Sequence, residues 1–319
     1  MLKTLQLMVF LGCALMTVHN SAVARQISLD KDLKYGVIRY NYQWQNMQGQ
    51  TFKTNFGLYA RDVQKGLTEF KRFSQADLKK YTAPKIAKFV QYNAPYGMKA
   101  KYNLQTEQIS FQSTSSRKLE QRKIDKFMER LEKEQQNANV EYFKERYYNY
   151  NPKENTVRPA HGIIAKRYVN GMRPVAIALS QDMNGRNSRE ITNHVLNFIQ
   201  SIPYDTLEDI RTTNGAGFQT PYGVLHDNKG DCDSKSVMFA AIMRNLYPYA
   251  RIIVVYVPGH ALVGFDYPKG KGDYAIEVDG TTFVLAEPVG PQKTALGKIS
   301  PKALSLMNRG AYSFEEVPY

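Results

Sequence analysis

The sequence predicts an α+β protein in two parts. A β-rich amino-terminal region with a long helix precedes a domain in which a cysteine-bearing helix packs on an antiparallel sheet. Three observations lead to this fold class. Apolar and aromatic residues alternate from Leu33 to Val63, a pattern typical of half-buried strands. Residues 118–148 combine dense mixed charge with apolar side chains at helical spacing. Cys232 opens a second helical pattern, and a β-branched run over 251–257 follows it.

The composition is that of an ordinary globular protein. The chain has 319 residues, 43% hydrophobic and 23% charged, which excludes collagen-like, low-complexity and mainly disordered proteins. Its 43 Lys and Arg against 29 Asp and Glu give a net charge of +14, which favours anionic partners or surfaces. The segment 149–158 is poor in apolar residues and contains Pro152, so it is the predicted linker between domains 25–155 and 156–319.

The first 24 residues have the three parts of a secretory signal peptide. Lys3 precedes an apolar run over 5–15, and Ala22-Val23-Ala24 supplies small residues for cleavage after Ala24. The apolar run is shorter than the roughly 20 residues that span a bilayer. The sequence therefore predicts an exported, periplasmic or extracellular protein without a membrane span.

Cleavage at that point changes the cysteine content and the charge. It removes Lys3 and Cys13, so the mature chain carries a net charge of +13 and a single cysteine, Cys232. Lipid attachment at Cys13 is disfavoured, because a bulky Leu11 stands where such signals carry a small residue. A lone thiol in an oxidising compartment calls for a chemical role.

The elements follow in chain order. Gly49 lies near the middle of the first alternating region, which indicates a hairpin or a longer meander. The pattern over 75–92 leaves helix and strand open. The remaining expectations are strands within 98–111, a strand pair at 163–169 and 175–179, a helix over 188–201, and a polar stretch over 205–230.

Cys232 lies at the predicted start of a helix. Gly230 permits a tight approach and Asp231 is a suitable N-cap, so Cys232 falls in the first turn. There, unpaired backbone N–H groups and the positive end of the helix dipole favour a thiolate. Asp231 and Asp233 oppose this by like charge, so we expect a second activating group, such as a histidine.

A histidine and a carboxylate follow on predicted strands. Pro258-Gly259 ends the strand over 251–257, and His260 begins the next one. Two such strands packed on the Cys232 helix would bring His260 beside the sulfur. A hairpin over 275–286 then ends at Glu287, which we expect to orient the imidazole. Asp266 and Asp279 remain competitors for that role.

These residues resemble the transglutaminase-like superfamily of papain-type thiol enzymes. The resemblance covers roughly residues 188–290, and it lies in the order of the following features: Gly230-Asp231-Cys232 with its helix, the strand-borne His260, and the hairpin that ends at Glu287-Pro288. Phe198 to Tyr204 and Thr220-Pro221-Tyr222 also resemble the helix and loop that precede the cysteine in bacterial members.

The resemblance implies a papain-like fold and a role for each residue. Cys232 would be the nucleophile, His260 the base, and Glu287 the residue that orients the base. The family usually has Asp at the last position. This sequence has Glu, 27 positions after His260, and a Lys/Gly-rich insertion over 268–272.

The expected chemistry is acyl transfer through a Cys232 thioester. Water as acceptor gives a peptidase or amidase, which we favour, and a lysine-type amine gives a cross-linking transglutaminase. The Cys232 backbone N–H would stabilise the oxyanion together with Gln219 or Tyr222. A catalytically silent scaffold that binds the envelope is the alternative class of protein.

Other ligands are disfavoured. His226 is a weak rival base, and a zinc site from His194, His226, Cys232 and His260 lacks closely paired ligands. We therefore expect no metal and no cofactor. A nucleic-acid partner is disfavoured because no recognisable binding motif is present. The expected partners are a protein or peptide substrate and an anionic envelope surface.

Overall fold

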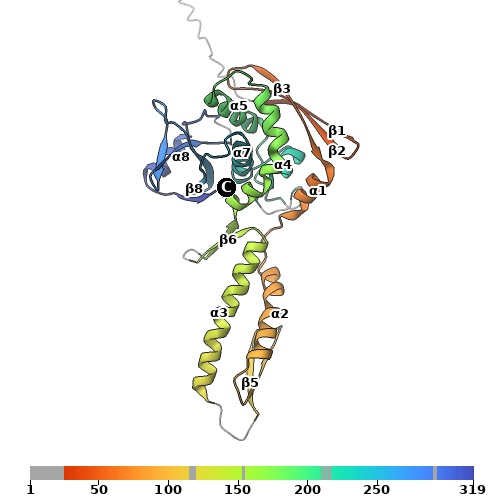
Figure 1. Ribbon diagram of the computed structural model, residues 1–319, viewed down its shortest axis with the longest axis vertical. Helices are drawn as coiled ribbons and strands as arrows, with labels where there is room; N and C mark the ends of the chain where they lie inside the picture. Colours follow the sequence, from red (N-terminus) through yellow and green to blue (C-terminus); the bar gives the residue numbers. More distant parts are fainter. Residues whose placement is uncertain are drawn as a thin grey trace, which may run out of the picture.

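The computed structural model describes residues 25–114, 120–152, 155–209, 211, 213, 217–289 and 293–319. The predicted signal peptide 1–24, including Cys13, lies outside the described residues. The described chain is α+β, as predicted, and has a rounded body from which a long arm projects (Figure 1). Within it, no helix combines the length and the apolar content needed to cross a membrane.

The alternating amino-terminal region is a three-stranded antiparallel meander. It consists of β1 (Arg25–Lys34), β2 (Val37–Gln45) and β3 (Thr51–Tyr59), which confirms the predicted meander. Its inner face buries aromatic residues, among them Tyr42 and Trp44. Their rings lie 5.1 and 5.6 Å from the ring of Phe198 on α5 (Ser188–Ser201), so the meander packs directly on the body.

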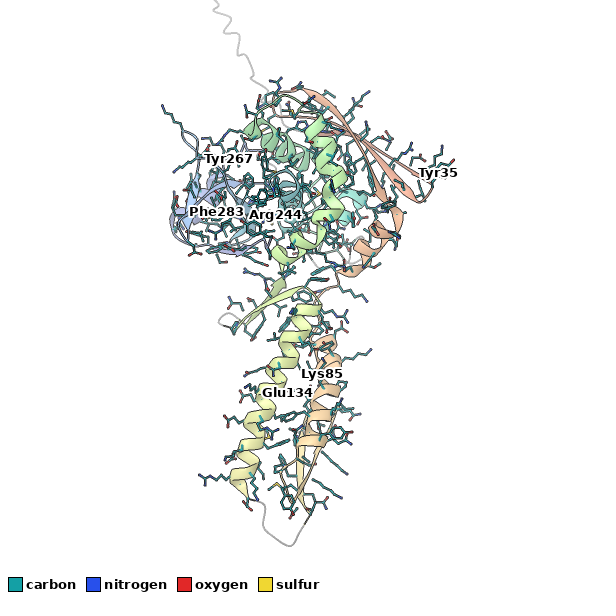
Figure 2. All side chains as sticks on the ribbon, viewed as in Figure 1. Tyr35, Lys85, Glu134, Arg244, Tyr267 and Phe283 are labelled. Carbon is teal, nitrogen blue, oxygen red and sulfur yellow. The ribbon has the colours of Figure 1, made fainter. Side chains whose placement is uncertain are left out.

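The arm is formed by α2 (Gln75–Asn93) and α3 (Gln121–Glu145), with the hairpin β4 (Met98–Tyr102) and β5 (Ile109–Ser113) packed on them. It follows α1 (Ala60–Glu69). The helix predicted over 118–148 is confirmed over 121–145, and Tyr148 already belongs to the next strand. The strands within 98–111 are confirmed, and the ambiguous 75–92 is helical. The arm has its own core of four buried residues: Ile86, Val90, Phe127 and Leu131. Lys85 and Glu134 mark its course in Figure 2.

The predicted linker is folded. Residues 149–158 contribute to a short hairpin of β6 (Tyr148–Asn151) and β7 (Thr156–Pro159) at the base of the arm. The boundary predicted between 155 and 156 therefore falls inside this hairpin. One hydrophobic core also extends across it, from Tyr42 of the meander to Phe239 of the carboxy-terminal half.

The strand pair predicted at 163–169 and 175–179 is wrong. Both segments lie in one helix, α4 (His161–Gln181), which packs against the helix that follows Cys232. Isolated β-branched residues suggested strands locally. Over the full length, however, buried residues recur at helical spacing, as Ile164, Tyr168, Met172, Val175 and Leu179. Packing of this face outweighs the local propensity, even with Pro174 inside the helix.

The body places the cysteine-bearing helix on a mixed-length antiparallel sheet. α7 (Cys232–Leu246) follows α6 (Pro221–Asp227) and packs on a sheet in the order β10-β11-β9-β8-β12. The bounds of the remaining elements are β8 (Ile252–Val257), β9 (His260–Asp266), β10 (Ala275–Val278), β11 (Thr281–Ala286), α8 (Pro301–Asn308) and β12 (Ser313–Glu316). The helix over 188–201 and the cysteine helix on its antiparallel sheet are confirmed.

The sheet has two differently covered faces. Side chains such as Val254 and Val263 belong to the main core together with α7. Their neighbours in sequence, such as Val255 and Leu262, pack with Ala303 of α8. This alternation is the period-two pattern of a strand buried on both sides, and it fixes β9 in the middle of the sheet. His260, the first residue of β9, is therefore held by the best-buried part of the sheet.

Candidate functional site

The loop into α7 fixes the position of Cys232. Asp231 is the N-cap, as predicted, and its Oδ1 accepts a hydrogen bond of 2.9 Å from the Ser234 N–H. Cys232 is thus the first residue of the helix, and its thiol is free. The backbone N–H of Cys232 lies in the unpaired first turn, where it is available to a ligand.

The surroundings of Cys232 favour the neutral thiol. Burial is the main cause that raises its pKa, followed by the negative charges of Asp233 and Asp231. Its Sγ lies 3.4 Å from Asp233 Oδ1, to which the S–H donates. A hydrogen bond from the Ala261 backbone N–H acts in the opposite direction and lowers the pKa. The helix dipole therefore does not suffice to produce a resting thiolate.

His260 and Glu287 meet as the sequence predicts. The Nε2 of His260 lies 2.6 Å from Glu287 Oε1, and Glu287 Oε2 accepts a 2.6 Å hydrogen bond from the Ser300 N–H. The carboxylate is almost fully buried. Because Glu287 takes Nε2, Nδ1 is the ring nitrogen left to accept a proton. Neither Asp266, exposed at the end of β9, nor Asp279, in the β10–β11 turn, takes this position.

The contact with Ala261 links the pair to the sulfur. Ala261 follows His260 directly on β9, and its N–H contacts Cys232. The backbone of β9 therefore meets the start of α7 one residue after His260. The prediction that the His260 side chain lies beside the sulfur stays a prediction.

The two predicted oxyanion donors have other partners. Gln219 Nε2 donates a 2.7 Å hydrogen bond to Asp227 Oδ2, and the Gln219 backbone N–H donates to Ser234 Oγ at 2.7 Å. Tyr222 packs toward α1 and α4, with its ring 5.2 Å from that of Tyr168. Their side chains do not line the cleft that contains His260.

Tyr204 also lies near Cys232, although no role was predicted for it. It is bridged in parallel to Gly230. Burial is the main cause that raises the pKa of its phenol, and the charge of a Cys232 thiolate is the next. Tyr204, His260 and Glu287 line one cleft of about 930 Å³. Tyr204 lies in the segment 198–204 that carried part of the family resemblance, so that segment held the signal.

A second histidine lies on the other side of Asp233. His161 is buried, its Nε2 is 3.5 Å from Asp233 Oδ2, and its Nδ1 is 2.8 Å from the hydroxyl of Tyr256. Burial lowers its pKa and keeps it neutral. The strand predicted over 163–169 begins two residues after His161. A helix predicted over 161–181 would have placed His161 on the same buried face as Ile164 and Tyr168.

Two further histidines among the described residues, His194 and His226, lie in other surroundings than Cys232. His194 packs against Trp44 and Phe52, and His226 Nδ1 lies 3.2 Å from the hydroxyl of Tyr40. Ligand atoms of Asp231, Cys232 and Asp233 lie within 4.8 Å of one another. Asp231 already caps α7 by accepting a hydrogen bond from the Ser234 N–H. The start of α7 therefore explains why these three residues lie close together.

Comparisons with protein-family models, with curated proteins and with solved structures found no match to this chain. The functional argument therefore rests on the geometry of the site. The family resemblance stays a prediction.

Proposed function

We propose that this protein is an exported thiol enzyme, similar to the transglutaminase-like superfamily, that cleaves amide bonds through a thioester on Cys232. The observation that carries the proposal is the part-buried 2.6 Å contact of His260 Nε2 with Glu287 Oε1. The next residue of the same strand, Ala261, forms a backbone hydrogen bond to Cys232. An oriented imidazole beside a thiol at a helix N-terminus is the arrangement that nucleophilic catalysis requires.

The reaction has two balanced halves. His260 Nδ1 takes the thiol proton while Sγ attacks the amide carbonyl carbon, and the tetrahedral oxyanion faces the Cys232 backbone N–H and the Tyr204 hydroxyl. The C–N bond breaks as the imidazolium gives its proton to the leaving amine. Water then attacks the thioester with His260 as base, the C–S bond breaks, and the thiol regains its proton.

The raised thiol pKa bears on how the first half proceeds. Burial and two carboxylates keep Cys232 protonated in the free protein. Proton transfer to the imidazole and attack by sulfur must then occur together, as in an oxygen nucleophile with a histidine base, rather than from a preformed ion pair. Glu287 supports this step because a carboxylate stabilises the imidazolium that forms.

Water is the acceptor that we favour. Tyr204 is 55% exposed and lines the cleft together with His260, so solvent reaches the cleft beside the proposed base. A cross-linking enzyme needs water to be excluded there. Cross-linking through a lysine-type amine is the alternative, and incorporation of ¹⁸O from labelled water into the acyl product distinguishes the two.

Export and envelope contact are part of the same proposal. Cleavage after Ala24 would leave Arg25, which lines the cleft, as the first residue of the mature chain. Residues 71–147, which include the arm, hold 17 Lys and Arg against nine Asp and Glu. This excess suits an anionic envelope surface. The mass of the secreted protein tests the cleavage site.

The test is cleavage of a mixed peptide library by the mature protein, followed by mass spectrometry. We expect Cys232→Ala to abolish cleavage without lowering the melting temperature. Cleavage by this variant at the rate of the parent would overturn the thioester mechanism. No cleavage by the parent, with full folding, would favour the scaffold that binds without turnover.

A further inference from the structure

The cleft beside His260 is lined by an excess of positive charge. Its basic lining residues are Arg25, Lys235, Lys293 and Lys302, and its acidic lining residue is Glu287. Both oxygens of Glu287 are already engaged, one by His260 and the other by the Ser300 N–H. The site therefore presents several cations and no carboxylate that is free to balance them.

These cations have no close ion-pair partner among the residues that the structure describes. None of the four forms an ion pair within 4.0 Å there. Arg25 and Lys302 are exposed, so water solvates them. Lys235 and Lys293 are in a different position, because the protein covers part or all of each side chain.

Lys235 is the most deeply placed of them. It is 1% exposed, and its ammonium donates to the carbonyl of Ile202, a neutral partner. Burial and the charge of Lys293 lower its pKa to about 7, although Asp231 acts the other way. Burial also lowers the pKa of Lys293, to about 8. A buried ammonium without a counterion is costly, and an anionic ligand would remove that cost.

We propose that this cleft binds a carboxylate of the substrate, held by Lys235 and Lys293 close to the amide that Cys232 attacks. The proposal deepens the proposed function, on which it rests for cleavage but not for binding. Arg25 and Lys302 add positive charge at the exposed part of the cleft and attract the anionic peptide. The preferred substrate is thus an acidic peptide rather than a neutral or basic one.

The carboxylate has two sources in a peptide. It is either the free carboxy terminus or the side chain of Glu or Asp. Four probes separate them: the pentapeptide acetyl-Ala-Ser-Xaa-Ala-Ser with Xaa as Glu or Gln, each with a free or an amidated carboxy terminus. The peptide with Gln and an amidated end carries no charge and serves as the reference.

The experiment measures binding of the four probes to the Cys232→Ala protein by calorimetry at pH 7. This variant cannot turn the peptide over, so binding is read without catalysis. We expect at least one carboxylate probe to bind tenfold or more tightly than the neutral probe. Lys293→Met should weaken that binding roughly tenfold, as expected for loss of a charge-assisted contact. Lys269→Met, the same change on an exposed residue outside the cleft lining, should leave it unchanged.

Two results overturn the proposal. One is equal binding of the neutral and charged probes, or no binding of any charged probe at millimolar concentration. The other is equal weakening by Lys293→Met and Lys269→Met, which would indicate attraction by net charge alone. Carboxylate binding in a protein without any peptidase activity refutes the proposed function instead. The two failures are therefore distinguishable.

Discussion

Cys232 is the residue at which opposing influences on one thiol can be weighed. A helix N-terminus favours a negative charge by about 0.3–1 kcal/mol at ordinary surface positions. Burial and an adjacent carboxylate each shift a pKa by more than this helix-dipole energy does. Here burial is the leading cause, and Asp233 is the nearest charge, at 3.4 Å from the sulfur. The thiol therefore stays protonated in the free protein.

Asp233→Asn should make the thiol more acidic. Removing a negative charge beside Cys232 lowers the pKa of the thiol, so the thiolate forms at lower pH and alkylation at pH 8 becomes faster. We expect about tenfold for each pKa unit recovered. The measurement is the rate of iodoacetamide labelling from pH 6 to 10. Asp279→Asn, the same change in the exposed β10–β11 turn, is the control, and an equal effect of both variants would contradict the assignment.

Glu287→Gln tests the orientation of the imidazole. A glutamine has one acceptor oxygen and one donor nitrogen, whereas the site presents two donors, His260 Nε2–H and the Ser300 N–H. One contact must be lost, so we expect kcat to fall at least 100-fold with little change in KM. We also expect the protein to lose about 1–3 kcal/mol of stability.

The pH–rate profile separates the two consequences. A role in holding the base shifts the acidic limb of that profile, and a purely structural role leaves its shape unchanged. Glu277→Gln on the exposed face of β10 is the matched substitution. Unchanged kcat in Glu287→Gln would exclude Glu287 as the orienting residue.

At the scale of elements, those whose pattern lies within one segment of the sequence could be predicted. The alternation in β2 and β3, the helical spacing of α3 and the apolar run of β8 each lie within one segment, and each was predicted. α4 was not, because its Ile and Val residues favour strands unless the whole buried face is considered. The order of cysteine, histidine and carboxylate was likewise readable from the segments that carry them.

What the sequence could not supply depends on contacts between distant segments. Tyr204 reaches the cleft through its bridge to Gly230, and His161 reaches Asp233 only because 161–181 forms one helix. The covering of Lys235 likewise follows from packing against Ile202, 33 positions away. Such placements follow from the tertiary fold, which no local pattern encodes.

The junction of α4 with β12 offers a test at this scale. Gly162 lies so close to the edge of the sheet that an added Cβ would lie 2.1 Å from the carbonyl oxygen of Glu316. Gly162→Ala must therefore push α4 or β12 away, and we expect a loss of about 1–3 kcal/mol, seen as a lower melting temperature. Lys166→Ala, on the exposed face of the same helix, should be nearly neutral. Equal melting of the two variants would refute the close packing.

At the scale of the whole molecule, the hydrophobic cores divide the protein differently from the sequence. The meander, α4, α5 and α7 share one core, which crosses the predicted boundary at 155/156. The arm has a separate cluster around Val90 and Phe127. The structural division is therefore between the body and the arm, whose chain both leaves and re-enters at the β6–β7 base (Figure 1).

This division predicts that the arm can be shortened without harm to the site. Arg130 donates to Asn93 at 2.8 Å, so α2 and α3 run side by side, and residues 89 and 135 lie at about the same height. A variant with 90–134 replaced by a four-residue Gly/Ser loop keeps the arm's base. Helices that neighbour each other this closely are commonly joined by loops of about 2–5 residues. We expect one cooperative unfolding transition and a Cys232 labelling profile within about twofold of the parent. The reason is that changes at distant sites without shared partners affect stability independently.

Phe198→Ala supplies the contrast, because this ring lies in the shared core against both Tyr42 and Trp44. Its truncation should cost about 3–5 kcal/mol and accelerate labelling of Cys232 through opening of the body. If the shortened arm had the same effect as Phe198→Ala, the arm would be part of the body's cooperative unit, and the division by cores would be wrong. If instead only the body variant exposes the thiol, the arm is free to contact a partner while the body that carries the cleft stays folded.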